Sequence, residues 1–183
     1  MGSLASFIMI TLDGFYEGPN QEFDFWQAFD SVFDEFSTQQ LADADALVFG
    51  RKTYDGMSQY WPTDDAIRAN PMVAELMNSK PKLMVSSSGA TADWNQSTIV
   101  RTLAELSDAK SQVERLLILG SPCLTANAAQ AGLLDELRIM INPIAIGSGK
   151  SLFNKMLERL PLNLAQTRAF ASGNVLLIYH LKT

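Results

Sequence analysis

Residues 45–54 read Asp-Ala-Leu-Val-Phe-Gly-Arg-Lys-Thr-Tyr, and the class of fold follows from this stretch. Its apolar first half, residues 46–49, is typical of a buried parallel strand. Gly50 then allows a sharp turn, because a glycine has no Cβ to restrict the backbone. Two cations and a hydroxyl follow at 51–53, where a helix should begin, and the free N–H groups of a helix start attract anions. The stretch therefore predicts a phosphate-binding turn, with an ordinary turn carrying two solvated cations as the alternative.

The composition of the chain predicts a soluble globular protein. Of its 183 residues, 47% are hydrophobic and 19% are charged, and the mean hydropathy is +0.03. We expect one domain over residues 1–183, large enough for a substantial core. The net charge of -6 and the pI of about 4.7 disfavour a nucleic-acid or acidic-membrane partner, because phosphates attract basic surfaces. No apolar run approaches the roughly 20 residues that a membrane helix needs.

Cysteine and histidine each occur once, as Cys123 and His180. One cysteine excludes an intrachain disulfide framework, and one histidine excludes a metal site built on several histidines. The N-terminal residues lack the basic region and the cleavage site of a signal peptide. We therefore expect a cytoplasmic protein without a bound metal.

Apolar runs alternate with helical patterns along the first two thirds of the chain. The runs at 46–49 and 115–119 each end at a glycine before a predicted helix, whereas the run at 82–85 ends in three serines. This alternation predicts a largely parallel α/β sheet. The expected strands lie at 7–10, 46–49, 82–85, 97–100 and 115–119, and the expected helices at 25–41, 51–59, 103–113 and 124–131, with a loop and a helix over 64–78.

The last third of the chain has a different pattern. A strand at 137–141 precedes a loop, and apolar segments at 162–170 and 175–181 flank a turn, which predicts an antiparallel hairpin at one sheet edge. Residues 147–151 resemble the end of a P-loop, but Ile144 stands where that motif requires a glycine. A surface turn is favoured there, with another kind of phosphate loop charged by Lys150 as the alternative.

Several strand ends carry side chains suited to a ligand, because ligands of α/β sheets bind beyond the carboxyl ends of the strands. The serines at 86–88 suit a phosphate or a ribose, although such a cluster is more often only a loop. The segment 12–19 either lines a pocket or forms a plain Asp-Gly turn. The sequence has no nucleophile elbow and no Cys/His pair, so we expect a bound cofactor to carry any reaction.

The order of these motifs resembles that of the dihydrofolate reductase-like superfamily. Over essentially its whole length the chain is most similar to stand-alone proteins related to the C-terminal reductase domain of the bifunctional deaminase-reductase of bacterial riboflavin biosynthesis. The motifs that carry the resemblance are Leu12-Asp13-Gly14, Gly50-Arg51-Lys52-Thr53-Tyr54, Ser86-Ser87-Ser88, Gly120-Ser121, and Asn142-Pro143 with the loop Gly147-Ser148-Gly149-Lys150.

The resemblance implies a three-layer α/β fold with a mixed, mostly parallel sheet of about eight strands and an antiparallel C-terminal hairpin. It also implies a homodimer and an NADPH cofactor lying across the strand ends. The activity would be hydride transfer to a small heterocyclic substrate, as in 5-amino-6-(5-phosphoribosylamino)uracil reductase or dihydrofolate reductase.

Roles for individual residues also follow from the resemblance. Arg51 would face the 2′-phosphate of the cofactor, Gly120 and Ser121 would receive the pyrophosphate, and the nicotinamide would lie against Met9 and Ile10. The cofactor-binding residues would be Gly50, Arg51, Lys52, Thr53, Ser86, Ser87, Ser88, Gly120, Ser121, Leu124, Thr125, Met9 and Ile10. The resemblance does not locate the substrate-binding residues. From their place near the strand ends we expect these to be Asp13, Tyr16 and Trp61.

Two features depart from the family pattern. Pro122 stands where relatives commonly have glycine, so one N–H contact to phosphate is lost, although proline suits a first helical turn. Folate-reducing relatives carry an acid on the first helix, but the helical periodicity turns Asp34 away from the apolar stripe. The catalytic residues are therefore not assigned. We expect an NADPH-dependent reductase, with a nucleotide-binding sensor that has lost catalysis, or a binder of hydrophobic compounds around Trp61, as alternatives.

Overall fold

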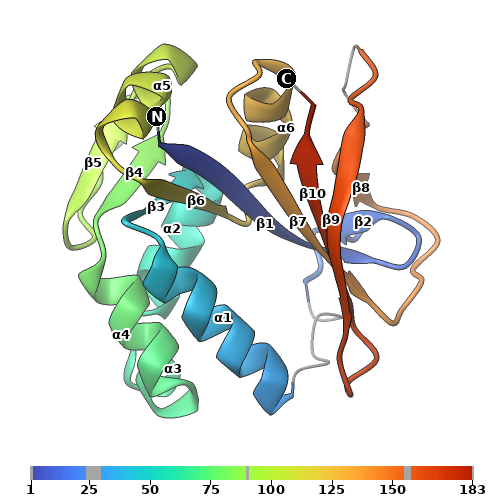
Figure 1. Ribbon diagram of the computed structural model, residues 1–183. Coiled ribbons are helices and arrows are strands. Elements are labelled where there is room, and N and C mark those ends of the chain that lie inside the picture. Colours follow the sequence, from blue (N-terminus) through green and yellow to red (C-terminus); the bar gives the residue numbers. More distant parts are fainter. Residues whose placement is uncertain (1, 24–29, 90, 155–157, 183) are drawn as a thin grey trace.

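The computed structural model describes residues 2–23, 30–89, 91–154 and 158–182 (Figure 1). Its central layer is an eight-stranded sheet, and a separate two-stranded ribbon lies beside it. The strands of the sheet are β1 (Ser3–Thr11), β3 (Ala46–Gly50), β4 (Lys82–Val85), β5 (Ser97–Val100), β6 (Arg115–Leu119), β7 (Glu136–Asn142), β9 (Leu162–Ala169) and β10 (Val175–Leu181). The ribbon pairs β2 (Phe15–Glu17) with β8 (Lys150–Ser151).

The sheet is mostly parallel, with the strand order β5-β4-β3-β6-β1-β7-β10-β9. The six strands from β5 to β7 in this order pair in parallel. β10 runs antiparallel to both of its neighbours, β7 and β9. This confirms the expected eight-stranded, mostly parallel sheet that an antiparallel C-terminal hairpin closes at one edge.

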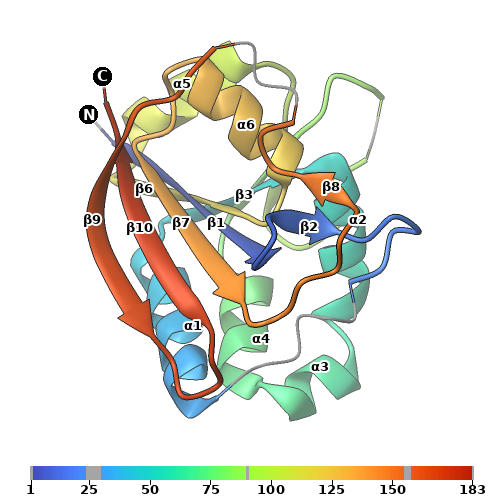
Figure 2. The same ribbon diagram turned by 90° about the vertical axis from the view of Figure 1, so that its right-hand side faces the viewer.

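Helices cover both faces of the sheet (Figures 1 and 2). The connections from β1 to β3 and from β3 to β4 step toward the β5 edge, whereas those from β5 to β6 and from β6 to β7 step back. Because parallel crossovers are right-handed, opposite directions of travel place the helices on opposite faces. One face carries α1 (Ser31–Asp43), α2 (Arg51–Tyr60), α3 (Asp64–Ala69) and α4 (Pro71–Ser79), and the other carries α5 (Leu103–Gln112) and α6 (Pro122–Gln130).

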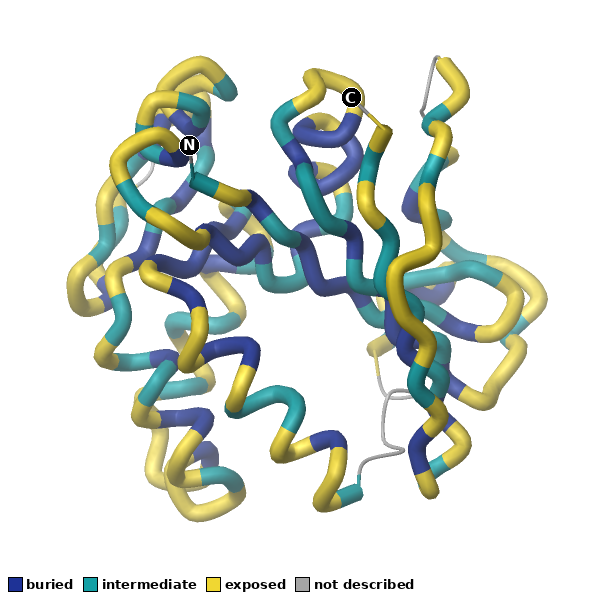
Figure 3. The backbone as a smooth tube through the Cα atoms, viewed as in Figure 1, coloured by how far each residue is buried: buried dark blue, intermediate teal, exposed yellow. Residues whose placement is uncertain are grey.

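Each helix layer packs on its own hydrophobic core. The core under α1, α2 and α4 includes Phe7, Phe49 and Met77, and the core under α5 and α6 includes Leu4 and Ile118. Side chains alternate along a strand, so successive residues of β1 enter different cores. Figure 3 shows the buried residues concentrated along the middle of the sheet, with exposed residues on the outer helices and on β9.

Most expected elements are present, with three differences. The helix expected over 25–41 is α1, which begins at Ser31 and is capped by Asp30; residues 24–29 lie outside the described part of the chain. The segment 64–78 forms two helices instead of a loop and a helix, because Thr63 and Asn70 each cap a helix start. The expected turn at 12–19 contains β2, which pairs with β8 of the loop at 144–151.

The loop at 147–151 does not lead into a helix within the described residues, which agrees with the rejection of a P-loop. No helix in the described parts of the chain is long and apolar enough to cross a membrane.

Candidate functional site

A ligand is expected at the end of the sheet where the parallel strands have their carboxyl ends, and this end is called the strand-end edge below. β3 and β6 are neighbours in the sheet, but α2 leaves β3 on one face and α6 leaves β6 on the other. In open α/β sheets such a reversal of direction marks the ligand-binding position. The glycine turn at Gly50 and the predicted pyrophosphate residues, Gly120 and Ser121, both lie at this point.

The starts of α2 and α6 touch each other at this edge. The Gly50 N–H donates a hydrogen bond to Ser121 Oγ at 2.9 Å. A Cβ added to Gly50 would lie 3.8 Å from the Cβ of Leu124, in the first turn of α6. The structure therefore brings together Gly50, Ser121 and Leu124, three of the residues that the resemblance assigns to a cofactor.

Both of these helix starts lack the side-chain cap that the other helices have. In α1, α3, α4 and α5 a side-chain oxygen accepts a backbone N–H of the first turn, from Asp30, Thr63, Asn70 and Thr102 respectively. α2 begins at Gly50 and α6 at Ser121, and neither has a side-chain cap bond among the described residues. First-turn N–H groups without a partner and the positive end of the helix dipole favour a bound anion.

Gly120 and Ser121 turn the chain sharply between β6 and α6. Their φ angles are 63° and 56°, in the left-handed region that favours glycine. A Cβ on Gly120 would lie 3.3 Å from Cγ2 of Thr53, so Thr53 on α2 also lies against this turn. Pro122 occupies the first turn of α6, which its fixed φ suits.

Two arginines, Arg51 and Arg101, contact Ser88 in the loop of serines 86–88 that follows β4. Arg51 Nη1 donates to Ser88 Oγ at 2.8 Å, and Arg101 donates to the backbone oxygen of Ser88. The hydroxyls of Ser86 and Ser88 lie 3.1 Å apart, while Ser87 is exposed. Arg51, Ser86 and Ser88 therefore form one cluster, as the sequence predicted.

Arg101 is the member of this cluster that sequence reasoning missed. It directly follows β5, as Arg51 directly follows β3, so both place a guanidinium at the same edge of the sheet. A cation in the first position after a predicted parallel strand is the signal that would have found it.

Lys52 lies apart from the arginine cluster. Its ammonium donates to Glu17 Oε2 at 3.1 Å, and Lys150 pairs with the other oxygen of the same carboxylate. The side chain of Glu17 is 4% exposed, and that of Lys52 is 66% exposed. Burial works against ionisation of Glu17, but the bonds from Lys150 and Lys52 outweigh it and hold the pKa of the carboxyl below its ordinary value. Lys52 therefore fastens α2 to β2, and Glu17 in turn joins β2 to β8 through Lys150.

Two pairs of predicted cofactor residues are divided by the fold. Met9 and Ile10 are both half-buried near the end of β1, but Met9 faces the core under α1 and Ile10 the core under α6. Leu124 lies at the strand-end edge, whereas Thr125 is fully buried and its Oγ1 lies 2.6 Å from Ser6 Oγ. The Thr125 hydroxyl is thus already bonded inside the protein.

Asp13 holds a loop in place. Its carboxylate accepts hydrogen bonds from Thr11 Oγ1 at 2.6 Å, from the Gly147 N–H at 2.7 Å and from the Ile146 N–H at 3.1 Å. The Thr11 hydroxyl, and after it the Gly147 N–H, hold the pKa of Asp13 below its ordinary value. Asp13 therefore ties the loop after β7 to the end of β1.

The other two predicted substrate residues do not gather around Asp13. Tyr16 on β2 lies against Cys123 in the first turn of α6, and burial, with a smaller effect of Cys123, raises the pKa of Tyr16 to about 12. Trp61 ends α2, where its Nε1 lies 3.1 Å from the sulfur of Met57. Within the described ranges, no hydrogen bond or ring contact joins Trp61 to Asp13 or Tyr16.

Asp34 is exposed on the first turn of α1, where its Oδ1 accepts a bond of 3.4 Å from Asn70. Its orientation agrees with the helical periodicity, and it is not placed as a proton donor.

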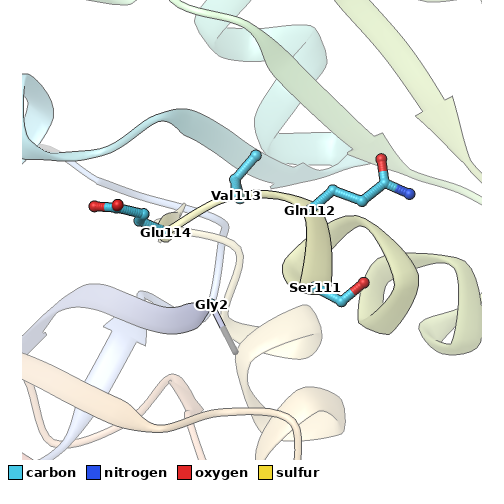
Figure 4. Close-up of a pocket in the computed structure, with 5 residues that line it drawn as sticks. All are labelled: Gly2, Ser111, Gln112, Val113 and Glu114. Carbon is cyan, nitrogen blue, oxygen red and sulfur yellow. The ribbon is translucent and has the colours of Figure 1, made fainter.

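Two hollows of the surface lie at the opposite edge of the sheet, where the strands begin. One, of about 340 Å³, is lined by Gly2, by the end of α5 at Ser111 and Gln112, and by the connection to β6 at Val113 and Glu114 (Figure 4). It contains none of the residues predicted to bind a ligand. The other, of about 410 Å³, is lined by the starts of β1, β6 and β7, the end of α1 and His180 near the end of β10.

The family of this chain follows from its sequence as well as its shape. The family described as the RibD C-terminal domain matches residues 3–176. The chain belongs to the RibD C-terminal domain family. The match spans every strand of the sheet except most of β10, and it confirms the resemblance expected from the order of the motifs.

Known proteins similar to this RibD C-terminal domain include one from Bacillus subtilis and several of known structure. The uncharacterized protein YyaP of Bacillus subtilis strain 168 is 33% identical over 176 residues, which cover 94% of this chain and 92% of that protein. A putative riboflavin biosynthesis protein from Shewanella sp. PV-4 has a TM-score of 0.75 at 20% identity and 99% coverage of both chains. Dihydrofolate reductase from Enterococcus faecalis, solved with NADP(H), has a TM-score of 0.64 at 15% identity, covering 100% of this chain and 98% of that one. These structures share the fold with this chain.

Proposed function

We propose that this protein is an NADPH-dependent reductase that transfers hydride to a small heterocyclic substrate. Membership of the RibD C-terminal domain family supports a reductase-type function. The observation that carries the finer proposal is the meeting of two uncapped helix starts, at Gly50 and Ser121, on the same sheet edge as the Arg51–Arg101 pair. A dinucleotide with a pyrophosphate and an additional phosphate matches this arrangement of N–H groups and cations.

Each part of the cofactor has residues that suit it. Arg51 and Arg101 offer two guanidinium groups for the 2′-phosphate, with the Ser86 and Ser88 hydroxyls beside them. The first-turn N–H groups of α2 and α6 suit the pyrophosphate, and the lack of a Cβ on Gly120 leaves its backbone open to close approach. Pro122 removes one N–H from this set.

NADPH supplies the hydride when it is bound, and the residues of the chain position the reactants. Lys52, Lys150 and Glu17 form a cluster with a net charge of about +1 beside Tyr16, which would favour a substrate that carries negative charge. The proton that balances the hydride comes from water in this proposal, because Asp34 is turned toward Asn70.

Titration of NADPH and NADH, followed by protein fluorescence, tests the proposal. We expect Arg51→Ala to weaken NADPH binding by about 10-fold to 100-fold, since one charge-assisted contact to phosphate contributes about 1.5–3 kcal/mol. NADH binding should not change. Arg68→Ala is the matched control, because Arg68 is an exposed helical arginine paired with Asp65 on α3. Failure to bind NADPH at millimolar concentrations would remove the reductase proposal.

A nucleotide-binding sensor without catalysis is the second candidate. Pro122 and the orientation of Asp34 favour it, because the first removes a phosphate contact and the second leaves no acid on α1 assigned to proton transfer. Steady oxidation of NADPH in the presence of dihydrofolate or 5-amino-6-(5-phosphoribosylamino)uracil would decide for the reductase. Binding without turnover on either would favour the sensor.

We also propose a homodimer, as the resemblance implies, in the cytoplasm, as the single cysteine of the sequence suggests. β9 is an edge strand of the eight-stranded sheet, and β10 is its one strand neighbour among the described residues. The Leu164 residue on β9 is 56% exposed, which suits contact with a second copy. Light scattering during gel filtration measures this directly, and a monomer at micromolar concentration would contradict it.

A further inference from the structure

The short strand β2 touches both helix starts of the candidate cofactor site. Tyr16 shares a hydrogen bond with the thiol of Cys123, which is the second residue of α6. The next residue of β2, Glu17, accepts a bond of 3.1 Å from Lys52, which is the second residue of α2. We call β2 and the turn after it, residues 15–22, the strap, because consecutive residues of this segment link the starts of two helices.

Lys52 links the strap to α2. Besides Glu17, its ammonium donates to Gln21 Oε1 at 3.4 Å and lies 5.9 Å from the ring centroid of Phe23. The side chain of Lys52 is 66% exposed, so it can turn without disturbing a core. Its backbone belongs to the first turn of α2, whose start has no side-chain cap among the described residues. One ammonium is thus within reach of both the strap and the position where a phosphate is expected.

Glu17 keeps a counterion when Lys52 leaves it. The side chain of Glu17 is 4% exposed, and Lys150 of β8 pairs with its Oε1. Breaking a buried ion pair is costly because it leaves an uncompensated charge, and Lys150 prevents that outcome here. A phosphate offers several anionic oxygens, so it competes well for Lys52 with a carboxylate that Lys150 already neutralises.

The turn after β2 holds its own shape. The Gly18 N–H donates to the Glu22 carbonyl at 3.1 Å, and the Gln21 N–H donates to the Gly18 carbonyl at 3.1 Å. The Glu22 carboxylate also accepts the Asn20 N–H at 2.7 Å. These bonds lie within the turn, so the strap can shift as a unit.

Gly14 is suited to be the hinge of such a shift. It joins β1 to β2 with φ at 90°, in the region that favours glycine, and no described atom lies within 4 Å of a Cβ added to it. The residue before it, Asp13, is fastened to the Ile146 and Gly147 N–H groups. A free position next to an anchored one lets β2 pivot while β1 stays in the sheet.

We propose that a phosphate bound at the start of α2 releases the strap. The ammonium of Lys52 leaves Glu17 for the phosphate, and residues 15–22 separate from α2 while Lys150 and Cys123 keep their contacts with β2. This inference rests on the cofactor site proposed above and adds a regulation to it. The strap carries Tyr16, so a second ligand gains access beside Tyr16 after the phosphate is bound.

Amide hydrogen exchange of residues 15–22 tests the proposal. We expect saturating NADPH to speed exchange there by about threefold to tenfold, since the strap loses a charge-assisted contact. Lys52→Met should show the faster exchange without a ligand and no further change with NADPH. Lys182→Met, at an exposed position near the C-terminus, should behave like the wild type. Protein fluorescence of each sample establishes that the cofactor is bound.

The reactivity of Cys123 distinguishes release of the strap from unfolding of the ribbon. Cys123 is the one cysteine of the sequence and is exposed, so a thiol reagent reports on it alone. In Lys52→Met its rate of reaction should stay within about twofold of the wild type, because the bond with Tyr16 remains. A rate more than about tenfold higher would mean that β2 has left α6 as well, and would overturn the proposal.

Inorganic pyrophosphate separates this proposal from the proposed reductase activity, because it has phosphates but no nicotinamide. It should speed exchange of residues 15–22 more than sodium chloride at equal ionic strength, which only screens charges. Faster exchange with pyrophosphate in a protein that does not bind NADPH would remove the reductase proposal and leave the strap. NADPH binding with unchanged or slower exchange would overturn the strap and leave the reductase. Wild-type exchange in Lys52→Met without a ligand would also overturn it.

Discussion

At the scale of single residues, Ser121 has an unusual combination of backbone and side-chain roles. It adopts a left-handed conformation without being glycine, with φ at 56°. For an L-amino acid other than glycine, this conformation costs roughly 1–2 kcal/mol of conformational energy. Its hydroxyl accepts the N–H of Gly50 at 2.9 Å, so the side chain offsets the strain by satisfying a backbone group of the neighbouring helix start.

We expect Ser121→Ala to lower the free energy of unfolding by about 1–2 kcal/mol, because the strain stays while the Gly50 N–H loses its acceptor. Urea unfolding followed by circular dichroism measures the change. Ser58→Ala is the control, since Ser58 bonds only the Asp55 carbonyl on the exposed side of α2, and it should change stability by less than about 0.5 kcal/mol. Equal stability of the two variants would show that the hydroxyl of Ser121 is not needed.

At the scale of elements, the carboxylate of Glu17 joins three segments that are distant in sequence. It lies on β2 and receives Lys52 from α2 and Lys150 from β8. Asp13 makes a second link between the same regions through the Ile146 and Gly147 N–H groups. The β2–β8 ribbon is short, so these side-chain links supply much of what holds it beside the sheet.

We expect Glu17→Gln to destabilise the protein by about 2 kcal/mol, less than a fully buried ion pair contributes, because the side chains of Lys52 and Lys150 are 66% and 47% exposed. Amide hydrogen exchange should become faster in residues 12–18 and 144–151, while that of α4 and β4 stays unchanged. Glu75→Gln, an exposed position on α4, serves as the control. Unchanged exchange in the ribbon would contradict the role given to Glu17.

The elements that sequence reasoning found are those with a clear hydrophobic period. The four strands at 46–50, 82–85, 97–100 and 115–119 were predicted within one or two residues. So were the helices that follow glycine or threonine starts. β2 and β8 were missed, because strands of three and two residues show no alternation. α3 was missed because six residues carry too little pattern, although Thr63 followed by Asp64 and Asp65 is a helix-start signal.

The sequence predicted where the candidate site lies better than it predicted the contacts of the individual side chains. The strand ends at 50, 86–88 and 120–121 were expected to meet, and Gly50, Ser121 and the Arg51–Ser88 contact do lie at one edge. Sequence could not show that Lys52 turns to Glu17, since consecutive helical residues point about 100° apart and the partner decides the direction. The split of Met9 and Ile10 was readable from strand alternation, which places successive side chains on opposite faces.

At the scale of the whole molecule, Lys82 couples the stability of the fold to pH. The residue is fully buried at the start of β4, its ammonium donates to the carbonyls of Asn78, Lys80 and Asn95, and it lies 4.5 Å from the ring centroid of Trp94. Burial lowers the pKa of Lys82 to about 8 from the ordinary value of 10.5. Between these two values the unfolded chain holds a proton that the folded chain has released.

We therefore expect Lys82 to increase the free energy of unfolding by about 3 kcal/mol as the pH rises from about 8 to about 10.5. This gain is lost again as the pH falls back to 8. Lys82→Met keeps the length of the side chain and should abolish this part of the slope. Urea unfolding across the pH range measures it for the wild type, for Lys82→Met and for the exposed control Lys182→Met. Identical slopes in all three proteins would exclude an effect of Lys82.

The hydrogen bond between Gly50 and Ser121 has a consequence for how the protein unfolds. The sheet separates the two cores, yet at this bond the start of a helix from one layer meets the start of a helix from the other. A ligand that binds both helix starts would link the two helix layers at the ends of the strands. Both layers would then melt together, at a temperature that climbs with the concentration of that molecule. Binding of a ligand at this site would thus couple the unfolding of the two helix layers.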